Sequence, residues 1–137
     1  MLQTALLDKK GMTLVEVLIA LVVLLLVSLA MMQTALVSID SNMRNVLRDE
    51  AVSIAEMGMS EARNTSFSSL SPGPSSTSVL RNFRNIASFP YTVARTVTDL
   101  NVDNKQVNIA VTWEWKENTV ANGNPYTHSI TTIVKRP

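Results

Sequence analysis

An unbroken apolar segment near the N-terminus constrains this chain more than any other feature. No charged residue occurs between Glu16 and Asp40, and Ser28 is the only polar residue in the stretch 17–32. As a helix, the 21 residues from position 12 to position 32 would span roughly 31 Å at ~1.5 Å per residue, enough to cross a bilayer core of ~30 Å. The segment therefore predicts a membrane-spanning helix over residues 12–32.

The residues that flank this segment are informative as well. A short leader, residues 1–11, ends in Lys9, Lys10 and Gly11. Lysines beside a membrane segment hold their end in the cytoplasm, which places everything after residue 33 outside. Glu16 lies at the edge of the apolar run, and a carboxylate near a bilayer centre costs roughly 2.5–3.5 kcal/mol and is functional by default.

Three interpretations fit an apolar segment at this place. It could be a simple signal anchor, or a secretory signal peptide whose apolar region, residues 17–27, precedes a small-x-small cleavage site at Ser28-Leu29-Ala30. The second interpretation predicts a soluble exported domain released after Ala30. Neither interpretation explains the carboxylate of Glu16.

The third interpretation does explain it. The sequence Lys9-Lys10-Gly11-Met12-Thr13-Leu14-Val15-Glu16 resembles the processing motif of type IV prepilins and pseudopilins. In that family a basic leader ends in glycine, an apolar residue opens the mature chain, and glutamate occupies the fifth mature position. Met12 departs from the usual phenylalanine. The resemblance implies that prepilin peptidase cleaves between Gly11 and Met12 and that Met12 is then N-methylated.

The resemblance also gives Glu16 a role. Cleavage creates a positively charged amine at Met12 in apolar surroundings, and a buried amine is costly unless it is paired. A carboxylate from a neighbouring subunit offsets that cost and fixes the axial register between subunits. Glu16 is thus expected to be an assembly residue and not a catalytic one.

The helix is expected to continue past the membrane segment, over residues 33–64. This stretch contains no proline and only one glycine, Gly58. Its apolar residues recur at offsets of three and four, with a gap near Ala51, which is typical of an amphipathic helix. The predicted apolar stripe comprises Leu36, Ile39, Met43, Leu47, Ile54 and Met57.

The remaining chain predicts a loop followed by a small sheet. Residues 65–90 include a Ser/Pro/Gly-rich stretch that is typical of a loop. Residues 91–137 alternate in polarity over three stretches, near 91–98, 107–116 and 126–134, and Asn122-Gly123 supplies positive-φ residues for a turn. The expected fold class is therefore α+β and pilin-like: a long N-terminal helix packed against a small antiparallel sheet head.

No catalytic or metal site is evident in this sequence. Trp113 and Trp115 share the apolar face of their predicted strand, which indicates core packing, and His128 is the only histidine. The segment Asp99–Asn104 begins like a calcium loop, as found in some pseudopilins, but it lacks the required glycine and glutamate, so a turn is favoured. The absence of cysteine excludes thiolate catalysis and cysteine-bound metals, and we expect no enzyme activity and no cofactor.

The resemblance implies a structural subunit of an extracytoplasmic filament. The helix end Ala55–Arg63 is most similar to minor pilins of the PilV type, whereas the tryptophan-bearing strand is similar to the I-type pseudopilins of type II secretion. The implied partners are prepilin peptidase, other pilins or pseudopilins and an inner-membrane assembly platform. The implied location is the bacterial inner membrane, with the head in the periplasm, and then a surface filament. A net charge of +1 argues against nucleic acid as a partner.

Overall fold

The computed structural model describes residues 13–137. One long helix, α1 (Leu14–Asn64), is followed by a short 3-10 helix, η1 (Phe67–Ser69), and four strands: β1 (Gly73–Phe83), β2 (Ile86–Asn101), β3 (Asn104–Trp113) and β4 (Tyr126–Lys135). Contacts divide the chain into two compact units, Met1–Asn42 and Met43–Pro137. The predicted α+β class is confirmed.

The start of α1 is set by Thr13. Its hydroxyl oxygen accepts a hydrogen bond from the backbone N–H of Glu16 at 3.2 Å, and its carbonyl accepts the N–H of Val17. A threonine followed three residues later by glutamate is the sequence signature of a capped helix N-terminus. The order Thr13-Leu14-Val15-Glu16 therefore begins a helix at the first turn of the apolar segment.

The first unit contains the apolar part of α1. Its side chains from Leu14 to Met32 are all exposed, and the most apolar 18-residue window has a mean hydropathy of 3.0, so the helix is long and apolar enough to cross a membrane. Two of its hydroxyl groups bond to the helix itself: the Ser28 hydroxyl donates to the Leu24 carbonyl at 2.8 Å, and the Thr34 hydroxyl donates to the Ala30 carbonyl. Such internal bonds lower the cost of a hydroxyl in lipid.

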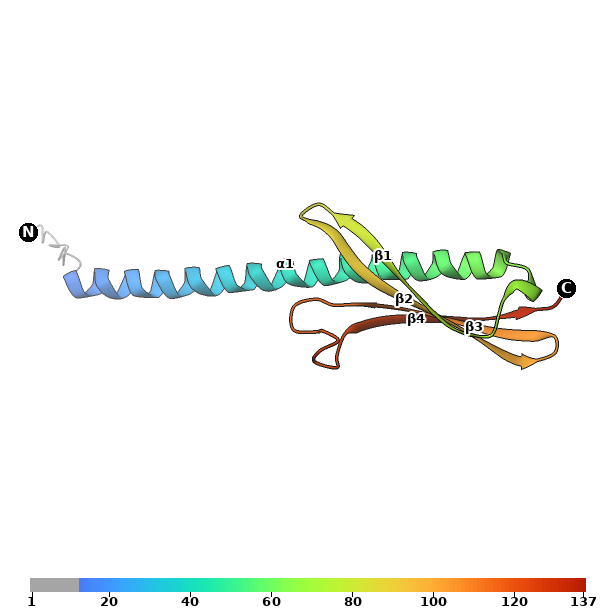
Figure 1. The fold of residues 1–137 in the computed structure, drawn as a ribbon. Helices are drawn as coiled ribbons and strands as arrows, with labels where there is room; N and C mark the ends of the chain where they lie inside the picture. Colours follow the sequence, from blue (N-terminus) through green and yellow to red (C-terminus); the bar gives the residue numbers. More distant parts are fainter. Residues whose placement is uncertain (1–12) are drawn as a thin grey trace, which may run out of the picture. The chain divides into compact units, whose positions relative to one another are not determined.

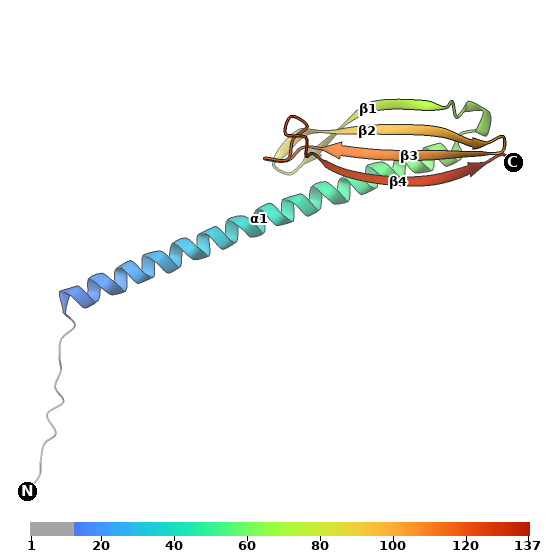
Figure 2. The ribbon, with the colours of Figure 1, turned by 90° about the horizontal axis from the view of Figure 1, so that it is seen from below.

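The second unit is a helix packed on one face of a sheet. The four strands form an antiparallel meander in the order β1-β2-β3-β4, and α1 from Met43 onward lies across one face (Figures 1 and 2). Thirteen of the fourteen buried core residues belong to α1 and the sheet, and Leu47, Tyr91 and Val111 are fully buried among them. The Tyr91 hydroxyl donates to the Leu47 carbonyl at 3.0 Å, which ties the sheet to the helix.

The expected loop over residues 65–90 is wrong in most of its length. Residues 73–83 form strand β1, which pairs with β2 from Gly73↔Val97 to Phe83↔Ile86, and β2 itself begins before residue 91. Pro74 is compatible with this strand because β1 lies at the edge of the sheet, where one side needs no ladder hydrogen bonds. The serine and threonine residues whose composition predicted a loop therefore form one strand of a long β1–β2 hairpin.

The expected helix stripe is correct only in part. Leu47 and Ile54 are buried, but Leu36 and Ile39 are exposed and Met57 is 55% exposed. The remaining buried positions of the helix are mostly alanines, namely Ala51, Ala55 and Ala62, together with Met59. Small side chains at these positions let the helix approach the sheet closely: a Cβ at Gly58 would lie 3.1 Å from the Ile109 Cδ1.

The connection between β3 and β4 is longer than a tight hairpin. Gly123 adopts the expected positive φ of 68°, but Asn122 does not. Trp115 and Asn118 form an isolated bridge, and the Glu114 carboxylate accepts the Val120 N–H at 2.6 Å. The Glu114 side chain therefore stabilises the conformation of this loop, in addition to Gly123.

Candidate functional site

Most of the predicted processing residues lie outside the described part of the chain. These are the leader lysines Lys9 and Lys10, and the cleavage pair Gly11 and Met12. Glu16 is described. The geometry of the candidate site therefore begins at Thr13, one residue after the predicted start of the mature chain.

Glu16 lies in the first turn of α1. Its side chain is exposed, and its backbone N–H bonds to the Thr13 hydroxyl. A carboxylate in this turn interacts favourably with the positive end of the helix dipole. The carboxylate is thus held at the end of the helix nearest the predicted new amine, and it remains open to a partner.

The helix surface beyond Glu16 is a continuous apolar surface. Large aliphatic side chains from Leu14 to Met32 are between 41% and 79% exposed and encircle the helix without a polar face. A soluble monomer rarely exposes so much contiguous apolar area. Such a surface is expected to be surrounded by lipid or by other apolar helices.

The tryptophans pack in the core, as predicted. Trp113 is 5% exposed and stacks on Tyr126 with ring centroids 5.6 Å apart. Trp115 is half-buried beyond the end of β3, with its ring 6.4 Å from that of Phe89. Neither ring forms an open platform for a ligand.

His128 lies on the helix-facing side of β4 and is half-buried. Its Nε2 atom is buried and has no hydrogen-bond partner among the described residues. Acid–base catalysis needs a second group that orients the imidazole and a reacting group within reach. No interaction of the described residues supplies either at this ring.

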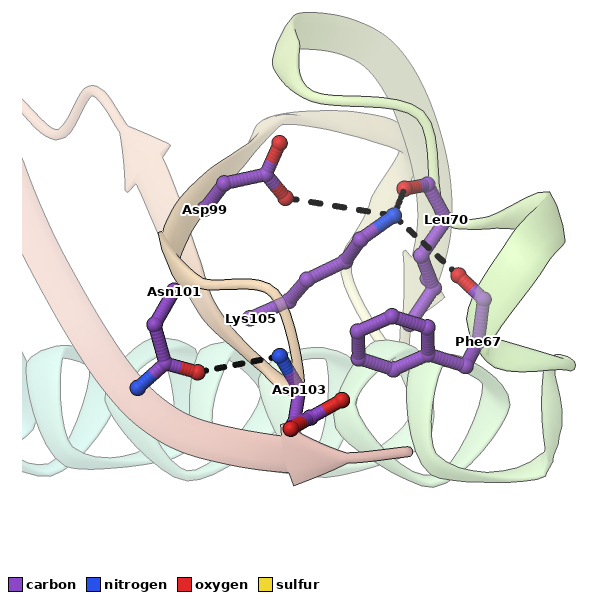
Figure 3. A network of polar contacts seen from close by, with 6 residues as sticks. All are labelled: Phe67, Leu70, Asp99, Asn101, Asp103 and Lys105. Atoms are coloured by element: carbon purple, nitrogen blue, oxygen red, sulfur yellow. Dashed lines mark hydrogen bonds and ion pairs between the residues drawn. The ribbon is translucent and has the colours of Figure 1, made fainter. Parts of the chain in front are cut away.

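The calcium-like segment is tied to the loop after α1 by a lysine (Figure 3). The Lys105 ammonium donates to the carbonyls of Phe67 at 3.1 Å and Leu70 at 2.5 Å, and lies 3.9 Å from an Asp99 carboxylate oxygen. Two carbonyls and a carboxylate are also the ligand types that calcium prefers. Because the ammonium already occupies this position, the turn interpretation of the segment is the better one.

Sequence reasoning missed this lysine network. Lys105 lies 4.7 Å from the centroid of the Phe67 ring, and the Arg136 guanidinium lies 5.2 Å from the same centroid. The network borders a surface cavity of about 660 Å³. Phe67 and Lys105 are separated by 38 positions, so no local motif could indicate their contact.

Tyr91 has a clearly perturbed proton affinity. Burial raises the pKa of the Tyr91 hydroxyl well above its ordinary value; the Glu50 carboxylate raises the pKa further, and Arg81 opposes the shift. Glu50 and Arg81 form an ion pair at 2.6 Å. The hydroxyl donates a hydrogen bond to the Leu47 carbonyl, so burial in the helix–sheet core accounts for the raised pKa.

Comparison with known families identifies one segment. The model of the prokaryotic N-terminal methylation motif matches residues 7–32, which include both the predicted cleavage site and the apolar part of α1. Among curated proteins and solved structures, no match to this chain was found.

Proposed function

We propose that this chain is a minor type IV pilin, which primes a pilus or is incorporated into it. The proposal starts from the match of residues 7–32 to the prokaryotic N-terminal methylation motif, which supports a type IV prepilin-like protein. The observation that carries the proposal is the continuity of the methylation motif with an exposed apolar helix. Gly11, Met12 and Glu16 have the required offsets, and the helix that starts at Leu14 stays apolar to Met32. The role is structural and not catalytic.

Each part of the chain then has a task. Removal of residues 1–11 by prepilin peptidase frees the amine of Met12, which is N-methylated. Residues 12–32 hold the subunit in the inner membrane, with the head in the periplasm, until the assembly platform moves it into a filament. There the apolar helices of neighbouring pilins replace lipid, and Glu16 of one subunit neutralises the amine of another.

A minor pseudopilin of a type II secretion system is the second candidate. The strand that carries Trp113 favours it, because I-type pseudopilins have a similar strand. The helix end Ala55–Arg63 favours the minor pilin.

Deletion of the gene in the native bacterium separates these two candidates. If the chain is a minor pilin, the deletion should lower the number of surface pili by about tenfold or more and leave the secretion of exoproteins unchanged. Pili are counted by electron microscopy and measured in sheared fractions. Complementation with the full chain should restore pili. Normal piliation with retained exoproteins in the periplasm would contradict the minor-pilin proposal and favour the pseudopilin.

A further inference from the structure

A groove lies between α1 and strand β1. It has a volume of about 420 Å³ and is lined by side chains of α1, of the first two strands and by Ile109 of β3. Ser75 and Thr77 of β1 line the groove from the helix-facing side of the sheet, yet both are exposed. The helix therefore leaves the helix-facing side of β1 uncovered.

Strand β1 is also an outer edge of the sheet (Figure 2). Within the described sheet it pairs only with β2, and none of the described backbone hydrogen bonds outside the sheet reaches it. In an antiparallel ladder, every second residue of an edge strand turns its N–H and C=O away from the paired strand. Proteins usually protect such an edge with charged residues or proline, but the segment 75–80 carries neither, although Pro74 and Arg81 flank it. The edge is therefore open to pairing with a further strand.

One half-buried charge in the groove lacks an opposite partner. Arg95 of β2 lines the groove, and no ion pair of its guanidinium occurs among residues 13–137. Glu61 of α1 borders the same groove, but its side chain is exposed and likewise forms no ion pair there. Water screens an exposed charge more strongly than a half-buried one, so the guanidinium dominates the field inside the groove. A carboxylate is the group that complements this guanidinium.

The spacing of the strands allows a carboxylate to reach the guanidinium from the open edge. A strand added beside β1 would lie about 4.8 Å from β1 and roughly 10 Å from β2. The residue of β1 that lies between Arg95 and the added strand is Ser75, whose side chain is small. A glutamate on the added strand can therefore extend over Ser75 to meet Arg95.

The rest of the groove offers apolar contacts. Val79 of β1 is half-buried, and Met57 of α1 is 55% exposed. Val79 lies on the same face of β1 as Ser75, because the side chains of a strand alternate between its two faces. The groove therefore fits a strand whose groove-facing side chains include both an acid and an aliphatic residue.

A second copy of this chain does not supply such a strand from its own sheet edges. Strands β1 and β4 contain no aspartate or glutamate, and they would bring Arg81 and Lys135 instead. We propose that β1 and the groove bind an extended segment of a different protein, which adds a fifth strand to the sheet and pairs a carboxylate with Arg95. Main-chain hydrogen bonds to the edge give the affinity, and the groove gives the specificity. This binding goes beyond the proposed filament role and does not depend on it.

The test measures the binding of fluorescent peptides to the full chain, purified in detergent, by fluorescence anisotropy. The probe is the peptide Thr-Val-Thr-Glu-Thr-Val-Thr, whose valines and glutamate share one face of a strand, and its matched peptide has glutamine in place of glutamate. Arg95→Gln removes the cation from the groove. Arg84→Gln makes the same change in the exposed turn between β1 and β2 and is the control variant. Circular dichroism verifies that each variant is folded.

We expect the wild type and Arg84→Gln to bind the glutamate peptide about tenfold or more tightly than the glutamine peptide, because a carboxylate forms charge-assisted hydrogen bonds with a guanidinium. Arg95→Gln should bind the two peptides equally. Glu61→Gln removes the groove's own carboxylate and should bind the glutamate peptide at least as tightly as the wild type does.

Two further peptides test the strand pairing. In one, the valines and the glutamate of the glutamate peptide are N-methylated; in the other, the threonines are. Each pattern blocks the amides along one edge of the peptide strand. One of the two methylated peptides should lose binding and the other should keep it, whichever register the peptide adopts on β1.

Three results of these measurements would overturn the proposal: a wild type without preference for the glutamate peptide, the same preference in Arg95→Gln, or equal binding of the two methylated peptides. A wild-type dimer in detergent that Arg95→Gln dissociates would overturn it as well, because the groove would then meet a second copy of the chain. All of these proteins are the uncleaved chain, so the results leave the pilin proposal untouched.

Discussion

Glu16 is the residue on which the assembly proposal depends most directly. If its carboxylate pairs with the amine of a neighbouring subunit, Glu16→Ala leaves an unpaired charge in apolar surroundings, at a cost of about 3–5 kcal/mol. We expect normal processing but at least about tenfold less protein in sheared filaments, measured by immunoblot against the cell-associated pool.

Gly11→Ala is the matched variant at the cleavage site. It should block or sharply reduce processing, so that the unprocessed chain accumulates in the membrane and migrates more slowly on the same immunoblot. Normal piliation in a Glu16→Ala strain would count heavily against an assembly role for that residue.

Tyr91 carries a prediction about pH. Its pKa is raised in the folded protein relative to ~10 in the unfolded chain, so above pH ~10 the unfolded chain releases a proton that the folded protein retains. Stability from this group is complete below pH ~10 and declines as the pH rises above it.

Tyr91→Phe removes both the hydrogen bond to Leu47 and this titration. Urea unfolding in detergent should show a loss of about 1 kcal/mol at pH 7, and a smaller difference from the wild type at pH 11. A difference between the two proteins that is constant from pH 7 to pH 11 would contradict the effect of burial on this hydroxyl.

At the scale of elements, the sequence indicated the helix and three of the four strands, but not strand β1. Helix periodicity and strand alternation are local patterns, so α1 and the segments near 107–113 and 126–134 were visible in them. The polar run Ser75-Ser76-Thr77-Ser78 pairs with β2, and Val79 and Phe83, farther along the same strand, pack against the core. The burial of the alanines of α1 could not be predicted from the sequence pattern, because a small side chain gives no strong periodic signal of hydrophobicity. These alanines nevertheless set how closely the helix approaches the sheet.

Lys105 links two elements that no motif connects. Lys105→Met would keep the apolar stem and leave the carbonyls of Phe67 and Leu70 without their donor. Because hydrogen bonds to charged groups are worth about 1.5–3 kcal/mol, we expect a loss of about 2–3 kcal/mol in urea unfolding. Lys135→Met, at an exposed position on β4, is the control and should change stability by less than about 0.5 kcal/mol.

The same network predicts how the head responds to removal of metal ions. Since the ammonium of Lys105 occupies the position between the carbonyls and Asp99, a chelator such as EDTA should leave the thermal unfolding midpoint of the wild type unchanged. A fall in the midpoint that added calcium reverses would show that the segment Asp99–Asn104 binds the ion after all.

At the scale of the whole molecule, the two compact units differ in how much of each can be predicted from local sequence patterns. The motif and apolar run of the first unit are contiguous in sequence, so the processing site and Glu16 could be proposed from the sequence. The surface of the second unit depends on the register between four strands, so the side chains that share its outward face can be named only when the pairing is known.

The intact mass and N-terminal sequence of the protein from its native membrane are the most direct test of whether the chain is a processed prepilin. Prepilin processing predicts a mature chain that begins at N-methylated Met12 and retains Glu16. A mature chain that begins at Met31 would lack both residues and would contradict it, because the protein would then be an ordinary exported domain released after Ala30.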